Sequence, residues 1–597
     1  MRVADYIFRR IADEAIEHVF FVPGGGAMHL NNGLLHEPRL TAVSMLHEQG
    51  AAIAAETYAR TSARFGVASV TSGPGVTNAL TGVAGAWLES TPTLTISGQV
   101  KRADLRGDSG VRQLGVQELD AVAIVSPITK YAVCLMDPDR VRYELEKCLH
   151  LMRSGRTGPV WLEVPMDVQA SEIDPDQLPG FAPAPQASTE LSDATVDRVA
   201  ELLRASVRPV ILAGNGVHAA AAEGALRALI ETAGLPTLTT WIAADLLEFD
   251  SPYYVGRCGT AAPRGPNFAV QNADLVLSIG CRMDFSITGF DRTQFARAAD
   301  VVVVDIDASE IAKLGDLPAL GVVSDAKRFL DALLQRIPSE PLPIDDWRAR
   351  CERWKTAYPV VLPEYRAQTE YVNSYVFAET LCDEMAEGDV LVPGSSGAAL
   401  DTFWLTARLK RGQRSLPTGS LGAMGYGLPA TIGACLGAGV QRTVSVDGDG
   451  GFVMNIQELE VVRRLRLPIK YFVLNNDGYA SIRSSQSGYF GEVIGADQRS
   501  GLTLPDITSV ARSFGIATVR VDSQVELRSV VRNALRVDGP IVCEVMVNPE
   551  QAIGPRVATR LAGDGRMVST PLEDLSPFLD RDELAENMII PLIDEPS

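Results

Sequence analysis

The sequence contains no run of about 18 consecutive apolar residues, the length that a helix needs to cross a bilayer. Basic residues are also in the minority, since 54 Lys and Arg stand against 74 Asp and Glu, for a formal net charge of −20. A broad basic face for nucleic acid is therefore not expected. These absences argue against a membrane or nucleic-acid partner and favour small-molecule chemistry.

Patterned cysteines are missing as well. The eight cysteines are scattered, with no CxxC pair and no metal-ligand spacing, so we interpret them as small buried residues in a reducing compartment. The N-terminal segment Met1–Phe20 is charged and has a helical pattern, without the apolar core of a signal peptide. We therefore expect a cytoplasmic enzyme.

Apolar strand patterns alternate with helical patterns along most of the chain, which predicts α/β domains with parallel, doubly wound sheets. A chain of 597 residues is too long for one core, so several domains are expected. A Pro- and Ala-rich linker, Pro175–Thr189, and a helical linker, Pro341–Tyr371, suggest the boundaries. We predict three domains at 1–170, 190–338 and 371–553, followed by a C-terminal tail at 554–597.

Two predicted neighbouring strands end in polar segments that contain glycine. The strand Arg442–Val446 is followed by DGDGG, and the strand Ile469–Leu474 is followed by NNDG. Each segment alone is an ordinary turn signal. Together they place Asp449 and Asn476 at the carboxyl ends of two strands, where parallel sheets bind ligands. Their oxygens suit Mg²⁺ with a bound phosphate, and the glycines let the backbone approach a diphosphate.

GDG followed after a fixed interval by NN resembles the cofactor motif of thiamine diphosphate (ThDP) enzymes. The resemblance implies that Asp449, the Asn476 side chain and the Gly478 carbonyl bind Mg²⁺, which anchors the diphosphate of ThDP. It also implies cofactor contacts at Gly25, Gly448, Gly450 and Tyr479.

Glu48 lies between a predicted strand and an Ala-rich helix. From its position alone, it is a helix N-terminal charge that is favourable with the helix dipole. The run HEQGA at 47–51, however, resembles the pyrimidine-binding motif of ThDP enzymes, whose glutamate contacts N1′ of the cofactor. The resemblance implies that Glu48 shares a proton with N1′ and thereby activates the thiazolium C2 position.

Two more segments resemble catalytic segments of the acetolactate synthases, a group of ThDP enzymes. The loop at 99–133 resembles one that closes over the donor, with Gln117 at the active-site position; Val116 replaces the usual aromatic before it. The segment at 419–429 resembles one that bends the cofactor, where Met424 would wedge between the two rings and the Gly422 carbonyl would accept from the 4′-amino group. Without the resemblance, the first is a surface loop and Met424 fills a core.

The second domain resembles the FAD-binding domain of acetolactate synthases. That group commonly has an RFDDR-like run, whereas this chain has RMDFS at 282–286, so the second acidic and basic pair is missing. Relatives use the same domain for ADP or for no ligand, and both alternatives stay open. The implied site of a non-redox FAD comprises Gly214, Gly216, Gly259, Arg282, Asp284, Asp307 and Asp325.

The resemblance covers nearly the whole chain and implies a homodimeric or homotetrameric carboligase. Such an enzyme decarboxylates a 2-oxo acid, here pyruvate, and transfers the acetyl unit to a 2-keto acid or another ketone. No Trp follows Trp404, although the group has one near Ser484 and Ser485 that helps to select a 2-keto acid. A bulky acceptor such as a keto-sugar, or a decarboxylase that releases an aldehyde, is therefore an alternative. The resemblance also implies that the C-terminal tail is a lid.

Overall fold

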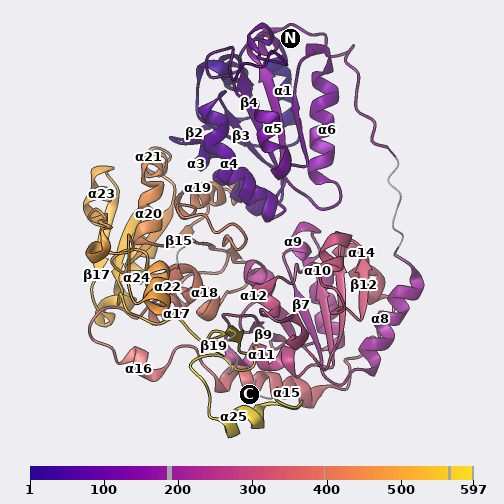
Figure 1. The fold of residues 1–597 in the computed structure, drawn as a ribbon, viewed down its shortest axis with the longest axis vertical. Coiled ribbons are helices and arrows are strands. Elements are labelled where there is room, and N and C mark those ends of the chain that lie inside the picture. Colours follow the sequence, from indigo (N-terminus) through magenta and orange to yellow (C-terminus); the bar gives the residue numbers. More distant parts are fainter. Residues whose placement is uncertain (185–190, 396, 562–566, 594–597) are drawn as a thin grey trace.

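The computed structural model describes residues 1–184, 191–395, 397–561 and 567–593. They form three α/β domains, each built on a six-stranded parallel sheet with helices on its faces (Figure 1). The first domain (indigo) lies at the top of the figure, the third (orange) at the left and the central one (magenta to pink) at the lower right. The prediction of three doubly wound domains is confirmed, while their exact boundaries stay predictions.

The sheet of the first domain has the order β2-β1-β3-β4-β6-β5. Three of its inner strands, β3, β4 and β6, are buried along their whole length, as expected for parallel strands covered on both faces. The strands are β1 (His18–Phe21), β2 (Thr41–Ser44), β3 (Gly66–Val70), β4 (Thr93–Gln99), β5 (Tyr131–Cys134) and β6 (Val160–Pro165). The helices nearest the site are α3 (Glu48–Ser62) and α4 (Pro74–Leu88).

The central sheet has the order β12-β11-β10-β7-β8-β9. Its helix α14 (Ala326–Leu334) buries positions 326, 329, 330 and 333, which form one apolar stripe at helical spacing. The strands are β7 (Pro209–Ala213), β8 (Thr237–Thr239), β9 (Tyr254–Arg257), β10 (Leu275–Ile279), β11 (Asp300–Asp305) and β12 (Leu320–Val323). Further helices are α8 (Asp193–Ala205), α9 (Gly216–Ala219), α10 (Glu223–Ala233), α11 (Arg264–Gln271), α12 (Phe285–Thr288) and α13 (Ala308–Ala312).

The third sheet has the order β14-β13-β15-β16-β18-β17. Strands β15 and β16 pair in parallel, so the two polar strand ends found in the sequence are neighbours, as predicted. The strands are β13 (Val390–Pro393), β14 (Arg414–Ser415), β15 (Thr443–Gly448), β16 (Ile469–Asn475), β17 (Ala517–Val521) and β18 (Ile541–Met546). The main helices are α17 (Ser374–Glu384), α18 (Gly397–Thr406), α19 (Gly427–Gly437), α20 (Asp449–Met454), α22 (Ala480–Phe490) and α24 (Gln524–Arg536).

The first and third domains are joined by the packing of α3 on α19. A Cβ added at Gly433 would lie 2.0 Å from the Ala54 carbonyl oxygen, so only glycine allows the two helices to approach this closely. The Thr57 hydroxyl donates to the Ala430 carbonyl across the same contact (2.8 Å). The small residues of both helices therefore bring the N-terminal end of α3, with Glu48, to the third domain.

The second linker and the C-terminal tail both pack on the central domain. Helix α15 (Asp345–Ala357) is anchored by Trp347, whose indole N–H donates to the Pro209 carbonyl (3.0 Å). In the tail, the Leu572 carbonyl accepts from Asn267 Nδ2 (2.7 Å). Because the tail lies on α11 of the central domain, a lid over the active site stays a prediction. Residues 185–189 of the first predicted linker lie outside the described residues.

Candidate active site

The carboxylate of Asp449 lies at the carboxyl end of β15, where α20 begins, and is 2% exposed. Its Oδ1 accepts from the Gly450 N–H (2.8 Å) and its Oδ2 accepts from the Gly478 N–H (2.9 Å). Burial raises the pKa of Asp449 to about 6, because a poorly hydrated site disfavours the charged form. A bound cation would offset that cost, so the residue fits the role of a metal ligand.

The two asparagines that follow one another at the end of β16 have different surroundings. Asn475 Nδ2 donates to Glu544 Oε1 (2.7 Å), which fixes that side chain on the neighbouring β18. Asn476 is only 5% exposed, and its Oδ1 has no hydrogen-bond partner in the part of the chain that the structure describes. A buried amide oxygen without a partner is costly unless a ligand satisfies it. With Asp449 beside it in the same sheet, this oxygen fits a hard cation such as Mg²⁺.

Glycine is required at two backbone positions beside these ligands. A Cβ at Gly450 would lie 2.2 Å from the ring of Tyr479, which closes over this turn. Gly478 has a φ of 114°, and a Cβ there would lie 2.3 Å from the Ala496 carbonyl oxygen. These two positions therefore need glycine because a side chain at either would collide with its neighbours.

The segment between β14 and α19 presents Gly422 and Met424 at the surface of the single chain. Met424 is 43% exposed, so the interpretation of this residue as core filler is wrong. Gly422 has a φ of 62° and open space around its Cβ position. An exposed, flexible thioether two residues from an exposed glycine matches the implied role of a segment that contacts a cofactor.

In the first domain, Glu48 is the first residue of α3 and is 8% exposed. Asn78, on α4, donates from Nδ2 to Glu48 Oε2 (2.9 Å) and thereby orients the carboxylate. The neighbouring His47 caps the helix, since its Nδ1 accepts from the Gln49 N–H (3.1 Å). Gly25 is exposed at the start of a 3-10 turn, with nothing within 4 Å of its Cβ position.

The loop that contains Gln117 is organised by the residue after it. Glu118 is 7% exposed and accepts from the backbone N–H groups of Leu114 (2.7 Å) and Gly115 (3.3 Å). Gln117 itself has a φ of 65° and is exposed, and Val116 is 86% exposed. Sequence reasoning missed Glu118, because a buried carboxylate that accepts hydrogen bonds from its own loop has no characteristic spacing.

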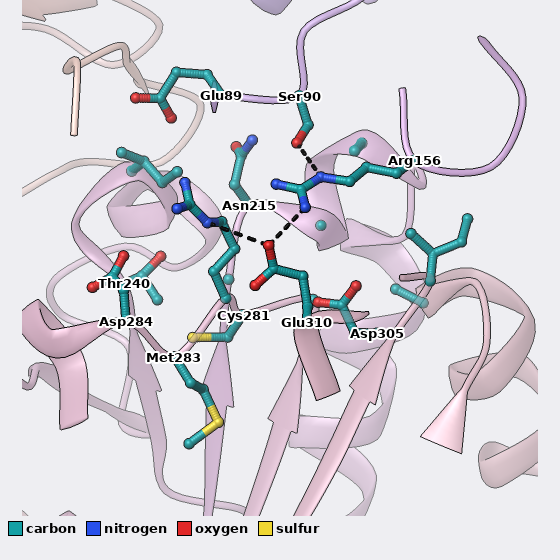
Figure 2. A pocket seen from close by; sticks show the side chains of 18 of the residues that line it. Glu89, Ser90, Arg156, Asn215, Thr240, Cys281, Met283, Asp284, Asp305 and Glu310 are labelled. Carbon is teal, nitrogen blue, oxygen red and sulfur yellow. Dashed lines mark hydrogen bonds and ion pairs between the residues drawn. The ribbon is translucent and has the colours of Figure 1, made fainter. Parts of the chain in front are cut away.

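A cavity lies where the central domain meets the other two domains (Figure 2). The central domain lines it with the ends of β7, β10 and β11, the first domain with Glu89 and Arg156, and the third with Gly419 and Ser420. Burial raises the pKa of Asp305, at the end of β11, to about 6. A carboxylate at such a strand end is the group that binds nucleotide ribose hydroxyls in doubly wound folds.

The cavity contains most, but not all, of the residues predicted for FAD. A Cβ at Gly214 would lie 2.2 Å from the Gly280 carbonyl oxygen, so this turn also depends on glycine. Gly259 and Asp307 are not part of the wall; Asp307 instead caps α13 by accepting from the Ser309 N–H (2.9 Å). The predicted residues that do line the cavity are Gly214, Gly216, Arg282, Asp284 and Asp325. Sequence reasoning missed Glu89, Arg156 and Glu310, which also line it.

The charges of this cavity are partly paired with one another. Arg156 donates from Nη1 to Glu310 Oε1 (2.7 Å) and from Nε to Ser90 Oγ (2.8 Å) (Figure 2). Arg282 donates from Nη1 to Ser420 Oγ (2.8 Å). Glu89 is 5% exposed, and its Oε2 has no partner among the described residues. The glycine-lined strand ends and this orphaned oxygen fit a ligand with nucleotide-like hydrogen-bond donors.

Comparison with known families assigns all three domains. Residues 1–124 match the N-terminal TPP binding domain of thiamine pyrophosphate enzymes, residues 196–333 their central domain, and residues 395–545 their C-terminal TPP binding domain. The chain belongs to the thiamine pyrophosphate enzymes. Glu48 lies in its N-terminal TPP binding domain, and Met424, Asp449 and Asn476 lie in its C-terminal one.

Among the curated proteins, this thiamine pyrophosphate enzyme resembles acetolactate synthases. It is 32% identical over 591 residues to acetolactate synthase 1, chloroplastic, of Zea mays, covering 95% of this chain and 89% of that protein. It is 29% identical over 563 residues to the acetolactate synthase large subunit of Pyropia yezoensis, covering 92% of each. It is 30% identical over 571 residues to the probable acetolactate synthase large subunit of Methanocaldococcus jannaschii, covering 93% of each. The chain is thus an acetolactate synthase-like member of the family.

None of the helices in the described ranges is long and apolar enough to span a bilayer. Nor do three or more His, Cys, Asp or Glu side chains gather into a metal site within those ranges.

Proposed function

We propose that this enzyme uses Mg²⁺ and ThDP to decarboxylate pyruvate and transfer its acetyl unit to a 2-keto acid. The observation that carries the proposal is the pairing of a buried carboxylate, Asp449, with the unsatisfied Oδ1 of Asn476 at adjacent strand ends. The names of the curated relatives support the same reaction type.

In this proposal, some residues of the chain would bind the cofactor and another would activate it. Asp449, Asn476 and the Gly478 carbonyl would hold Mg²⁺ and, through it, the diphosphate. When bound, ThDP would supply a nucleophilic thiazolium carbon, and its cationic ring would accept the electron pair left by CO₂. Glu48, oriented by Asn78, would share a proton with the aminopyrimidine N1′.

The loop containing Gly422 and Met424 would set the bent shape of the cofactor. The Gly422 carbonyl would accept from the 4′-amino group, and the Met424 side chain would fill the space between the two rings. This is a proximity contribution, because it brings the amino group to the carbon that must lose a proton. Gln117, exposed on the loop that Glu118 organises, would approach the substrate from the first domain.

Three small side chains bear on the identity of the acceptor, the carbonyl compound that receives the acetyl unit. Ser484 and Ser485 are exposed on α22, and the 86% exposed Val116 is on the loop of the first domain. These small side chains favour, as a second candidate, a bulkier acceptor such as a keto-sugar. Incubating the purified enzyme with pyruvate alone separates the cases, because 2-acetolactate supports the synthase reaction and acetaldehyde alone supports a decarboxylase. CO₂ release that requires an added ketone supports the bulky acceptor.

For the central cavity we propose FAD in a structural, non-redox role. The glycine turns at Gly214 and Gly280, the carboxylate of Asp305 and the cation of Arg282 support a dinucleotide there. The protein should then be yellow when purified and release flavin on denaturation. A colourless protein that binds ADP but not FAD would contradict the flavin while leaving the ThDP site intact.

The assembly we propose is a homodimer or homotetramer in which two chains complete each ThDP site. In support, no hydrogen bond or ion pair found within the described residues joins Glu48 to Asp449 or Asn476. On the single chain, Met424 (43%) and Leu421 (39%) also remain exposed. Light scattering during gel filtration tests this, and an active monomer would contradict it. The eight free cysteines are consistent with a reducing compartment, for which we propose the cytoplasm.

A further inference from the structure

The segment from Pro417 to Tyr426, here called the 417–426 loop, is fixed to the first domain at both ends. Arg60, a buried residue of α3, donates from Nη1 to the Pro417 carbonyl (3.0 Å) and to the Tyr426 hydroxyl (3.2 Å). Glu56 pairs with the same guanidinium (3.4 Å). The ends of the loop are therefore set by α3, while Gly422 and Met424 lie between them.

The middle of the loop is held by a second charged residue of the first domain. Oε1 of Glu89 accepts from two consecutive backbone N–H groups, those of Gly419 (2.9 Å) and Ser420 (2.8 Å). Glu89 is 5% exposed, and bonds from neutral donors to a buried carboxylate are stronger than ordinary ones. Arg282 of the central domain adds a bond to Ser420 Oγ (2.8 Å). At Ser420, four residues before Met424, the loop is thus attached to two other domains.

The same contacts form part of the wall of the central cavity. Glu89, Arg282, Gly419 and Ser420 all line it. Figure 2 shows Glu89 across the cavity from Asp305 and Glu310. The second oxygen of Glu89, Oε2, is buried without a partner in the described chain. A ligand in this cavity would therefore meet the back of the loop, at the carboxylate that holds it.

We propose that Glu89 is a positioning residue through which a nucleotide in the central cavity orders the 417–426 loop and so prepares Gly422 and Met424 to receive ThDP. A hydrogen bond from the nucleotide to Oε2 would fix the carboxylate while Oε1 holds the loop. The inference rests on the proposed function. It means that a flavin with no redox role would still contribute, by ordering the 417–426 loop. Binding at each site then favours the other by the same factor, as linkage requires.

A purely structural role for Glu89 makes a different prediction. In that case its removal would loosen the loop equally with and without a nucleotide, and the two ligands would bind independently. Ligand coupling, rather than activity, is therefore the quantity to measure.

The first experiment is calorimetric titration of full-length protein that has been freed of ThDP and flavin. ThDP with Mg²⁺ is titrated in the absence and presence of saturating FAD. We expect FAD to tighten ThDP binding by about tenfold or more in the parent protein, and by less than about twofold in Glu89→Ala. Glu89→Gln, which keeps one acceptor oxygen for the loop N–H groups, should retain part of the coupling.

Glu310→Gln is the matched control. Glu310 lines the same cavity but pairs with Arg156 and makes no hydrogen bond to the loop among the described residues. Glu310→Gln removes one negative charge from the cavity, as Glu89→Ala does. The affinity for FAD can therefore change, but FAD should still tighten ThDP binding by the same factor as in the parent protein. Equal coupling in the parent and Glu89→Ala would overturn the proposal.

Hydrogen exchange tests the same contact without any ligand. In Glu89→Ala, the amides of Gly419 and Ser420 lose their acceptor, so we expect faster exchange across the peptide that covers the 417–426 loop. Unchanged exchange would refute the positioning role even if activity falls. If neither FAD nor ADP binds the parent protein, the coupling fails but ThDP turnover stands; if ThDP does not bind, the proposed function itself is contradicted.

Discussion

At the scale of single residues, a few buried polar groups distinguish this site from an ordinary turn. Asn475 and Asn476 are chemically identical neighbours, yet only Asn476 has a buried amide oxygen without a partner in the described chain. Asp449 is likewise buried, and burial is the main cause of its raised pKa, to which the nearby Asp477 carboxylate adds. These two groups gain from a cation, which is the physical reason to assign them to Mg²⁺.

Replacing the activating carboxylate should separate catalysis from binding. In Glu48→Gln we expect kcat to fall by about 100-fold or more, because proton transfer by a positioned side chain contributes that much. ThDP affinity should change little, since the residues proposed to hold the diphosphate lie in the C-terminal TPP binding domain. Steady-state kinetics with a parallel ThDP titration check this. Turnover at the parent rate would remove Glu48 from the mechanism.

Adding one methyl group at Gly450 should disturb the site from within. The new Cβ would lie 2.2 Å from the Tyr479 ring, so the ring or the turn must move. We expect a loss of stability of about 1–3 kcal/mol, typical of overpacking, together with weaker ThDP binding. Gly488→Ala is the control, because Gly488 lies in helix α22 with open space around it. Thermal unfolding of both variants is the measurement, and similar melting curves for the two would disagree with this account.

At the scale of elements, charged side chains connect helices and loops that are far apart in the sequence. Glu458, which follows α20, accepts from the backbone N–H groups of Leu46 (3.2 Å) and His47 (3.0 Å) in the first domain. Arg483 of α22 donates to the Asn476 carbonyl (3.1 Å), so this helix supports the turn that contains Asn476. Such contacts have no sequence signature, since neither residue of a pair such as Glu458 and Leu46 indicates in the sequence which distant residue it will contact.

The buried Glu458 should make stability depend on pH. Burial raises its pKa to about 7, above the ordinary value of 4.5. Between these two values the folded state binds more protons than the unfolded state, so this group's contribution to stability falls as pH rises and levels off above about 7.

Thermal unfolding of the parent protein and of Glu458→Gln from pH 4.5 to 8 isolates this contribution. The variant should lose stability less steeply over that window, because its amide does not titrate. Glu460→Gln, which alters an exposed carboxylate two residues away, should follow the parent curve. Parallel curves for the parent and Glu458→Gln would show that the titration lies elsewhere.

At the scale of the whole molecule, the sequence predicted the three doubly wound domains and the pairing of the two strands that end at the motif. It predicted them because apolar strand patterns and polar strand ends are local features. It did not predict that α3 packs on α19, since small residues such as Gly433 and Ala54 indicate close packing but not with which helix. The parts of the central cavity that the first and third domains supply, such as Glu89, Arg156 and Ser420, were missed for the same reason, because they come from distant segments.

In the proposed mechanism, Asp449 and Asn476 at the ends of β15 and β16 would hold Mg²⁺ and, through it, ThDP. Calorimetric titration of the purified parent protein with ThDP, with and without Mg²⁺, should show binding that requires the metal. We expect Asn476→Ala to weaken ThDP binding by more than about 100-fold. The loss of a direct metal ligand should cost more than the loss of a residue that only orients a ligand, which costs about 10- to 100-fold. Asp477→Asn alters the exposed neighbour on the same turn and should bind like the parent. Metal-independent binding, or equal affinity in Asn476→Ala, would contradict the proposed site.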